Sequence, residues 1–232
     1  MIIVATLLRS FTGFGFGLAA VPGLALFLPP VGAVVLTAAL SLALGVQTWP
    51  RVRGLIPLRP LLPMFLFSIV GTVLGARLLV ELSSQWFYLA IGAAVITACI
   101  VLSRFHPRRR ESSTALLSAT GITSGVLNGA FAIPGPPVII YAMATQPDPA
   151  ASRALMIIFF SFCSLIGLLT YSLSGLVHLA SLWLFLLAYP AMWLGDRLGQ
   201  YLFLRFAGRF YRRVALMALL VIGVSITLKG LL

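Results

Sequence analysis

Long runs of apolar residues recur along the whole chain, and short stretches rich in arginine separate them. An apolar run of roughly 18 or more residues has the length of a helix that crosses a bilayer. The runs show no strand-like alternation of apolar and polar positions, so we expect helices rather than a β-barrel. Six runs each have the length of one crossing: 31–49, 61–80, 85–103, 154–173, 178–199 and 214–231.

Two further apolar segments, 1–30 and 114–145, have a different pattern. Each holds about thirty residues, too many for one crossing and too few for two crossings with a turn. Glycine and proline interrupt each segment near its middle. Because a pair of half-length helices that enters and returns on the same side fits this length, we predict a re-entrant hairpin in each segment.

The two broken segments resemble each other, which indicates an internal duplication. Five positions of the first segment recur 112 residues later in the second: Gly13, Gly17, Ala20, Pro22 and Gly23 match Gly125, Gly129, Ala132, Pro134 and Gly135. The order of matches continues farther along the chain, where Gly75-Ala-Arg77 resembles Gly195-Asp-Arg197. We therefore predict a first repeat at 1–103, a basic cytoplasmic linker at 104–113 and a second repeat at 114–232, all within one membrane domain.

Loop charge predicts that the two repeats have opposite orientations. The loop at 50–60 carries three arginines, whereas its counterpart near 174–180 has neither lysine nor arginine. The loop at 80–86 has no basic residue, whereas its counterpart near 203–213 has four. Cytoplasmic loops carry the excess of Lys and Arg, so equivalent loops with opposite charge indicate inverted repeats. The predicted fold is thus an all-α polytopic membrane protein with two inverted repeats, each a broken re-entrant hairpin plus three transmembrane helices, and both termini outside.

Composition supports a membrane protein and argues against nucleic-acid binding. Hydrophobic residues make up 61% of the chain and charged residues 9%, against about 25% charged in a soluble domain. The net charge of +12 is concentrated between the apolar runs, where it faces anionic lipid rather than forming one basic groove. Twelve of the sixteen basic residues lie in four such stretches: Arg51, Arg53 and Arg59; Arg104, Arg108, Arg109 and Arg110; Arg153; and Arg205, Arg209, Arg212 and Arg213.

The sequence shows no motif that is typical of an enzyme active site. It holds four acidic residues and shows no paired carboxylates, no H-x-x-x-H, no C-x-x-C and no nucleophile–base pair. We therefore expect no catalytic residues, no metal and no cofactor. The N-terminus has no basic n-region and no A-x-A site, so we also expect no cleavable signal peptide.

The glycine-rich points of the two broken segments are the candidate substrate site. Inverted-repeat transporters bind substrate near the midplane, where interrupted helices meet and a half-helix directs free N–H groups at an anion. Glycine lets the backbone approach a ligand closely, and proline suits the first turn of the returning half-helix. The predicted substrate-binding residues are Arg9, Ser10, Thr12, Gly13, Gly15, Gly17, Pro22, Thr123, Ser124, Gly125, Asn128, Gly129, Pro134, Gly135 and Pro136.

Arg9 is the main reason for predicting an anion-binding site at the tips. It is the one arginine beside a glycine-rich tip, and no carboxylate lies near it in sequence. A buried guanidinium needs a negative partner, and a substrate anion would supply it. The alternative is that Arg9 extends to the membrane surface. The glycines have an alternative as well, helix–helix packing through small residues. We expect Arg77 and Arg197 to anchor at lipid headgroups and Asp196 to be a local charge partner.

At its two tips the sequence resembles the sulfite exporter TauE/SafE family, also called the toluene sulfonate uptake permease family. Three stretches carry the resemblance: Thr-Gly-Phe-Gly from Thr12 with Gly17 and Pro22, Gly-Pro-Pro-Val-Ile-Ile-Tyr from Gly135, and Leu-Gly-Ala-Arg from Leu74. The likeness covers essentially the whole chain. It implies transport of sulfite, sulfonates, sulfoacetate, thiosulfate or related anions across a bacterial inner membrane.

The hypothesis is therefore a secondary transporter whose partners are a small anionic substrate and membrane lipid, as a monomer or homodimer. Export is the favoured direction, since an inside-negative potential drives an anion outward and no carboxylate suited to ion coupling is visible. Two alternatives stay open. One is an H⁺- or Na⁺-coupled importer of sulfonates or carboxylates. The other is a non-transporting membrane scaffold.

Overall fold

The computed structural model describes residues 1–12, 15–104, 111–146, 148–206 and 209–231, without the side chains of residues 11–12, 102, 104, 200, 202–216 and 218. These residues form ten α-helices and one short 3-10 turn, η1 (Arg59–Leu61). The helices are α1 (Ile2–Thr12), α2 (Phe16–Ala25), α3 (Pro30–Val52), α4 (Leu62–Glu81), α5 (Ser84–Arg104), α6 (Thr114–Phe131), α7 (Gly135–Thr145), α8 (Pro149–Leu173), α9 (Leu179–Phe206) and α10 (Arg209–Leu231).

Five of the six predicted spans are confirmed as helices long and apolar enough to cross a membrane: Pro30–Val52, Arg59–Glu81, Ser84–Val101, Pro149–Leu173 and Leu179–Gly199. The sixth predicted span, 214–231, falls within α10. Its described apolar part is Leu219–Leu231, so this span stays a prediction. Large apolar side chains also face outward, as on Leu66 and Leu187, which are 61% and 76% exposed. The chain is an all-helical, multi-pass membrane protein.

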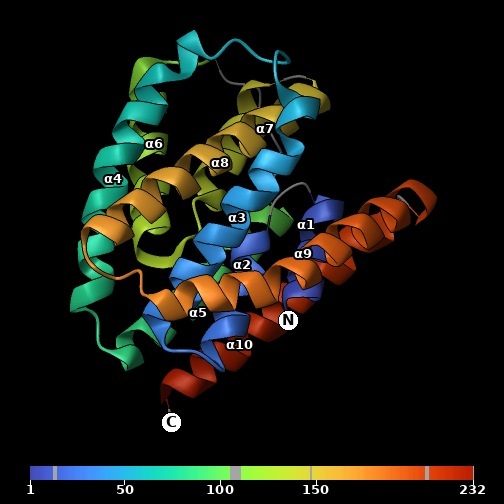
Figure 1. Cartoon of the computed structure of the whole chain (residues 1–232). Helices are drawn as coiled ribbons and strands as arrows, with labels where there is room; N and C mark the ends of the chain where they lie inside the picture. The colour runs from blue at the N-terminus through green and yellow to red at the C-terminus, as the bar shows by residue number, and fades with distance from the viewer. Residues whose placement is uncertain (13–14, 105–110, 147, 207–208, 232) are drawn as a thin grey trace.

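The helices pack in four long pairs: α4 with α6, α1 with α9, α3 with α8, and α5 with α10. Helices α3 and α8 cross in the middle of the molecule, and the other pairs lie around them (Figure 1). The chain termini lie toward the end opposite the loop that joins α3 to α4 (Figure 1). This arrangement brings the first and second halves of the chain into contact along most of their lengths.

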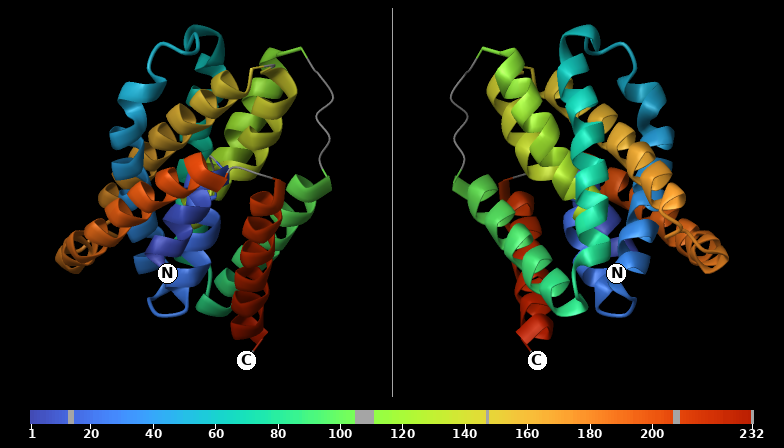
Figure 2. Two further views of the ribbon diagram at one scale, coloured as in Figure 1. Left: turned by 90° about the vertical axis from the view of Figure 1, so that its right-hand side faces the viewer. Right: turned by 90° about the vertical axis from the view of Figure 1, so that its left-hand side faces the viewer.

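Each segment predicted to be broken consists of two helices that turn back on each other, α1 with α2 and α6 with α7. The first pair starts at the end that holds the termini and the second at the opposite end (Figure 2). Helix α6 has 18 residues and is about 27 Å long, longer than a half-length helix.

The predicted 112-residue match between the broken segments is wrong as a structural equivalence. The returning helices begin at Phe16 and Gly135, whose numbers differ by 119. Gly17 lies in the first turn of α2, whereas its sequence match Gly129 lies in the last turn of α6. The reason is that Gly121, Gly125 and Gly129 form a stripe along α6 that packs against α4. The sequence comparison aligned two of these packing glycines, Gly125 and Gly129, with the glycines at the turn of the first segment.

That stripe lets α4 and α6 approach until their backbones touch. A Cβ atom added at Gly71 would lie 2.9 Å from the Val126 nitrogen, and one added at Gly129 would lie 2.6 Å from the Ala76 nitrogen. Gly121 and Gly125 make equally close approaches to α4. Without a hydrophobic driving force between membrane helices, such close contact between small residues supplies much of the association energy.

Candidate functional site

The turns of the two helix pairs meet inside the molecule. A Cβ added to Gly17, in the first turn of α2, would lie 2.5 Å from the carbonyl oxygen of Ala132, at the end of α6. Among the described residues, Gly15 in the first turn has a positive φ of 99°, and Ala132 in the second has one of 50°. Glycine adopts this conformation without cost, whereas alanine does so with strain.

Ala132 ends α6 as a left-handed C-cap. Its N–H donates to the Asn128 carbonyl at 2.7 Å, and the Ile133 N–H donates to the Leu127 carbonyl at 3.3 Å. The Tyr171 hydroxyl contributes from α8, lying 2.9 Å from the Asn128 carbonyl and 2.8 Å from that of Gly129. The carbonyls of Leu127, Asn128 and Gly129 near the buried end of α6 therefore have donors, which hold the turn in place.

Ala132→Val is expected to destabilise this turn by about 2 kcal/mol, because a β-branched residue is poorly accommodated at positive φ. The measurement is the apparent melting temperature of the purified protein in detergent. Ala132→Gly is the matched control and should melt at or above the wild-type temperature. Equal melting of the valine variant and the wild type would contradict this account of the turn.

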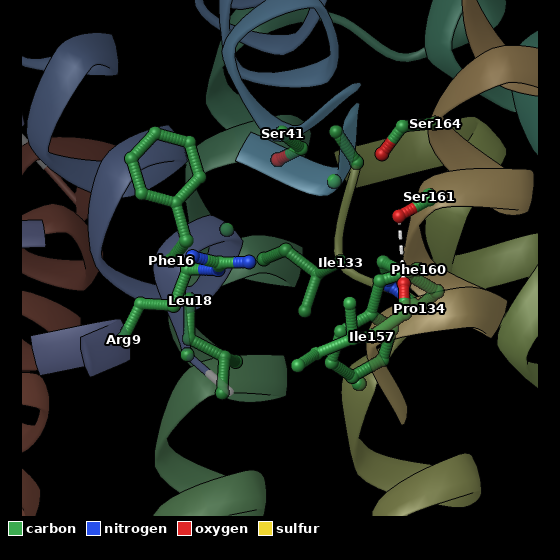
Figure 3. A pocket seen from close by; sticks show the side chains of 15 residues that line it. Arg9, Phe16, Leu18, Ser41, Ile133, Pro134, Ile157, Phe160, Ser161 and Ser164 are labelled. Atoms are coloured by element: carbon green, nitrogen blue, oxygen red, sulfur yellow. Dashed lines mark hydrogen bonds between the residues drawn. The ribbon is translucent and has the colours of Figure 1, made fainter. Parts of the chain in front are cut away.

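Between the two turns lies a cavity, here called the tip cavity, with about 520 Å³ of open volume including solvent at its mouth. Helices α1, α3 and α8 complete its wall. Its lining residues are Arg9, Gly15, Phe16, Gly17, Leu18, Ser41, Gly45, Ala132, Ile133, Pro134, Gly135, Ile157, Phe160, Ser161 and Ser164. In Figure 3 Arg9 enters from one side, with Ser161 and Phe160 on the opposite side. A mostly apolar cavity with a few polar groups is typical of a small-molecule site.

The N-terminal residues of α2 form one wall of this cavity. The N-cap Gly15 and the first-turn residues Phe16, Gly17 and Leu18 all line it, and the N–H groups at these positions have no intrahelical acceptor. Helix α7 differs, because its N-cap is Pro134 and its second and third residues are also prolines, which have no N–H. Among these positions α7 offers only the N–H of Gly135, so the expectation of several free N–H groups at both tips is wrong for α7 and stays a prediction for α2.

Arg9 has a carboxylate partner that the sequence did not indicate. Its guanidinium lies 3.5 Å from Asp196 Oδ1, and both side chains are largely buried, with 14% and 12% exposed. It also donates to the Thr48 hydroxyl at 3.3 Å. The expectation that a substrate alone would pair with Arg9 is therefore corrected. Asp196 pairs across 187 positions of sequence, while its neighbour Arg197 is exposed and lies over the Trp193 ring at 5.2 Å.

Two glycines explain how Asp196 reaches Arg9. A Cβ at Gly195 would lie 3.0 Å from the Thr6 side chain, and one at Gly199 would lie 2.5 Å from that of Ser10. Helix α9 therefore lies close against α1 and carries Asp196 into the interior. The spacing Gly195-x-x-x-Gly199 is the signal from which this contact could have been predicted.

Five of the predicted site residues line the tip cavity: Arg9, Gly15, Gly17, Pro134 and Gly135. Three other predicted residues, Thr12, Gly13 and Pro22, belong to the segment 1–30 but are not among the lining residues. Pro22 is buried inside α2, beyond its first turn, where the sequence argument had placed proline. Gly13 and the Thr12 side chain lie outside the described residues, so their predicted roles stay predictions.

The remaining predicted residues do not line the tip cavity. Ser10 is buried and donates to Thr6 and Asp196. Asn128 joins three helices, since its amide donates to Thr72 Oγ1 at 3.2 Å and to the Cys163 carbonyl at 2.8 Å. The other five are exposed Thr123, buried Ser124 with a hydroxyl that has no partner, half-buried Pro136, and the packing residues Gly125 and Gly129.

Sequence reasoning missed three hydroxyls in the tip cavity, those of Ser41, Ser161 and Ser164. They lie within the apolar runs of α3 and α8, outside the two broken segments that the sequence analysis chose as the site. Ser161 donates to the carbonyl of Ile157 at 2.7 Å, and its hydroxyl oxygen can still accept a bond. The available signal was the presence of hydroxyl groups in otherwise apolar spans.

Comparison with known proteins identifies the family. The family described as "Sulfite exporter TauE/SafE" matches residues 1–226 of the 232. The chain belongs to this family. The match confirms the resemblance seen at the glycine-rich tips and makes the chain a member of a transporter family, consistent with the absence of an enzyme motif in its sequence.

One relative of this TauE/SafE protein is named "Probable sulfite/organosulfonate exporter TauE", from Cupriavidus necator. The two sequences are 26% identical over 233 residues, an alignment that covers 97% of this chain and 91% of the relative. No solved structure matches the chain. Within the described part of this TauE/SafE protein, no group of three or more His, Cys, Asp or Glu side chains could hold a metal ion.

Proposed function

We propose that this protein is a secondary transporter that exports sulfite or organosulfonate anions across the bacterial inner membrane by alternating access. The observation that carries the proposal is the tip cavity, whose lining includes both Arg9 and the residues at the N-terminus of α2. Both are groups that bind anions, because a guanidinium pairs with oxyanions and a helix N-terminus presents free N–H groups.

The mixed lining of the tip cavity favours an anion with a compact charged head. The Arg9 guanidinium, the α2 amides and the Ser164 hydroxyl offer hydrogen bonds to several oxygens of a sulfite or sulfonate group. Ile133, Ile157 and Phe160 present apolar surface, which suits the carbon part of an organosulfonate. The name of the relative from Cupriavidus necator includes both substrate types.

The pattern of helix contacts supports two inverted repeats, 1–103 and 114–232, joined by a linker at 104–113. If α1 to α5 are paired in order with α6 to α10, the most extensive helix contacts have counterparts. Helix α1 packs on α9 as α6 packs on α4, and α2 packs on α3 as α7 packs on α8. Helices α3 and α8 are counterparts of each other and are in contact, and the same is true of α5 and α10. The glycines fit too, since Gly75 contacts α6 and Gly195 contacts α1. In such transporters one repeat rocks against the other around a fixed site.

Charge and voltage together favour export. Arg51, Arg53 and Arg59 lie around the loop from α3 to α4, which the positive-inside rule places in the cytoplasm. An inside-negative potential drives an anion outward by about 2.3 kcal/mol per charge for each 100 mV. Export therefore needs no coupling ion, whereas import would.

The test is sulfite and methanesulfonate flux in proteoliposomes that contain the purified protein. We expect flux of both anions that increases with a voltage driving them across the membrane and does not depend on a pH or Na⁺ gradient. Flux that follows a pH or Na⁺ gradient would replace this mechanism with the coupled importer. Absence of flux for every sulfur oxyanion tested would favour the membrane scaffold and reject a transport role.

A further inference from the structure

A second cavity adjoins the tip cavity on the side of the arginine-rich loops. Its polar lining consists of Arg9, Ser10, Thr48, Arg51, Arg153 and Asp196, and we call it the arginine vestibule. Arg9 and Ile157 belong to the walls of both cavities. The vestibule therefore ends at the residue where the tip cavity begins.

The arginine vestibule holds more positive than negative charge. Its described lining contains three guanidiniums and the carboxylate of Asp196, which together carry a formal charge of +2. Arg153 is near enough to interact electrostatically with both Asp196 and Arg51, and Arg9 with both Asp196 and Arg153. Like charges gathered in one hollow repel each other, and a bound anion relieves that repulsion.

Helix stability explains the position of Arg51 but not that of Arg153. Arg51 lies in the last turn of α3, where the helix dipole favours a cation. Arg153 lies near the N-terminus of α8, where the dipole disfavours one, and Asp148 already accepts hydrogen bonds from the first amides of that helix. Arg153 therefore gains nothing from its own helix at this position.

The three arginines of the vestibule differ in exposure between its outer end and the end that meets the tip cavity. Arg51 and Arg153 are exposed at the mouth, whereas Arg9 is largely buried at the inner end. A hollow lined by one sign of charge raises the local concentration of counter-ions and the rate at which they bind. Guanidinium groups also match the geometry of oxyanions, because each presents a planar fork of donors.

We infer that the arginine vestibule is a second anion site, which takes a small oxyanion from the cytoplasm and delivers it to Arg9. This inference rests on the proposed function and adds a separate recruiting site to it. The anion at Arg9 would then compete with Asp196 for the same guanidinium. A lipid phosphate has similar oxyanion chemistry, but the inner end of the vestibule, at Arg9, Ser10 and Asp196, is buried and suits a small soluble ion.

The experiment compares two double variants of the full chain in phosphatidylcholine vesicles, with sulfite supplied on the arginine-rich side. Arg51→Gln with Arg153→Gln removes two charges from the vestibule. Arg53→Gln with Arg59→Gln removes two charges from exposed positions nearby that do not line it. We expect the first pair to raise the apparent KM for sulfite about tenfold with less than about a two-fold change in maximal rate. The second pair should leave KM unchanged.

Ionic strength gives a readout that a structural role would not change. Raising potassium gluconate should increase the wild-type KM, because salt screens exposed charges, and should affect the vestibule variant much less. Equal shifts of KM in both double variants, or no shift in either, would overturn the second site. If phosphatidylglycerol binding is lost in the vestibule variant while its sulfite KM stays normal, the site takes lipid phosphate and the inference is also overturned.

Failure of this inference is distinguishable from failure of the proposed function. If the wild type transports sulfite and Arg9→Gln does not, yet KM is insensitive to Arg51 and Arg153, the vestibule site alone fails. If the wild type shows no flux, equilibrium binding of sulfite to the protein in detergent decides the matter. Binding that needs Arg51 and Arg153 supports the site without transport, and absence of binding overturns both proposals.

Discussion

Arg9→Gln is expected to reduce sulfite flux about 100-fold. Truncating one partner of a buried, hydrogen-bonded charge pair costs roughly 3 kcal/mol of binding, and about 1.4 kcal/mol corresponds to a factor of ten. Arg9 is the basic residue in the described lining of the tip cavity, so its loss removes the main attraction for an anion there. The measurement is initial flux in proteoliposomes at matched protein content.

The complication is that Arg9→Gln also removes the buried ion pair between Arg9 and Asp196, which destabilises the fold. The double variant Arg9→Gln with Asp196→Asn removes both charges and is expected to regain wild-type stability without regaining flux. Asp196→Asn alone should keep flux, because Arg9 retains its charge and the Thr48 contact. Restored flux in the double variant would show that Arg9 serves the fold and does not bind substrate.

Gly125→Val is expected to prevent stable packing of α4 against α6. A Cβ added at Gly125 would contact the Ser68 carbonyl oxygen and lie 2.9 Å from both Gly71 Cα and the Thr72 nitrogen. These are backbone atoms, which cannot rotate aside, so the helices must separate and lose their shared contacts. We expect a cost above about 3 kcal/mol, seen as loss of the monodisperse peak in size-exclusion chromatography and a lower melting temperature.

Gly32→Ala is the matched control, since it adds a methyl group to a glycine in α3 whose nearest neighbour is the Pro29 ring at 4.0 Å. That variant should melt at or slightly above the wild-type temperature, because alanine favours a helix. The smaller change Gly125→Ala separates packing from binding. If it lowers stability while sulfite affinity of the folded protein stays normal, Gly125 packs helices. A stable variant with weakened sulfite affinity would instead support the original binding role.

The sequence placed the substrate-site residues correctly where they lie at a helix turn, and incorrectly where glycines lie within a helix. Local backbone chemistry was informative at the tips, where Gly15, Gly17, Pro134 and Gly135 line the cavity. The repeated glycines Gly125 and Gly129 misled, because a membrane helix uses the same residue both for close helix contact and for close approach to a ligand. Nothing in the sequence separates these uses until the neighbouring helix is known.

The sequence also could not predict which charged residues from distant parts of the chain lie together, because this too depends on which helices are neighbours. Asp196 meets Arg9 only because α9 lies along α1, and Arg51 meets Arg153 only because α3 pairs with α8. The serines of the tip cavity follow the same rule, since Ser41 and Ser161 come from that same α3–α8 pair. The matching of the repeats also needed the structure, which placed the turns 119 positions apart rather than 112.

The sequence by itself determined the helical class, five of the six spans, the interrupted segments and the family. Each of these depends on apolar run length, on glycine and proline positions or on loop arginines, all of which act locally against the membrane and its surfaces. The tertiary structure alone decided which charges pair, which glycines pack and where the two cavities lie. Those features depend on contacts between helices far apart in the chain, which hydrophobicity does not specify when every helix is apolar on most sides.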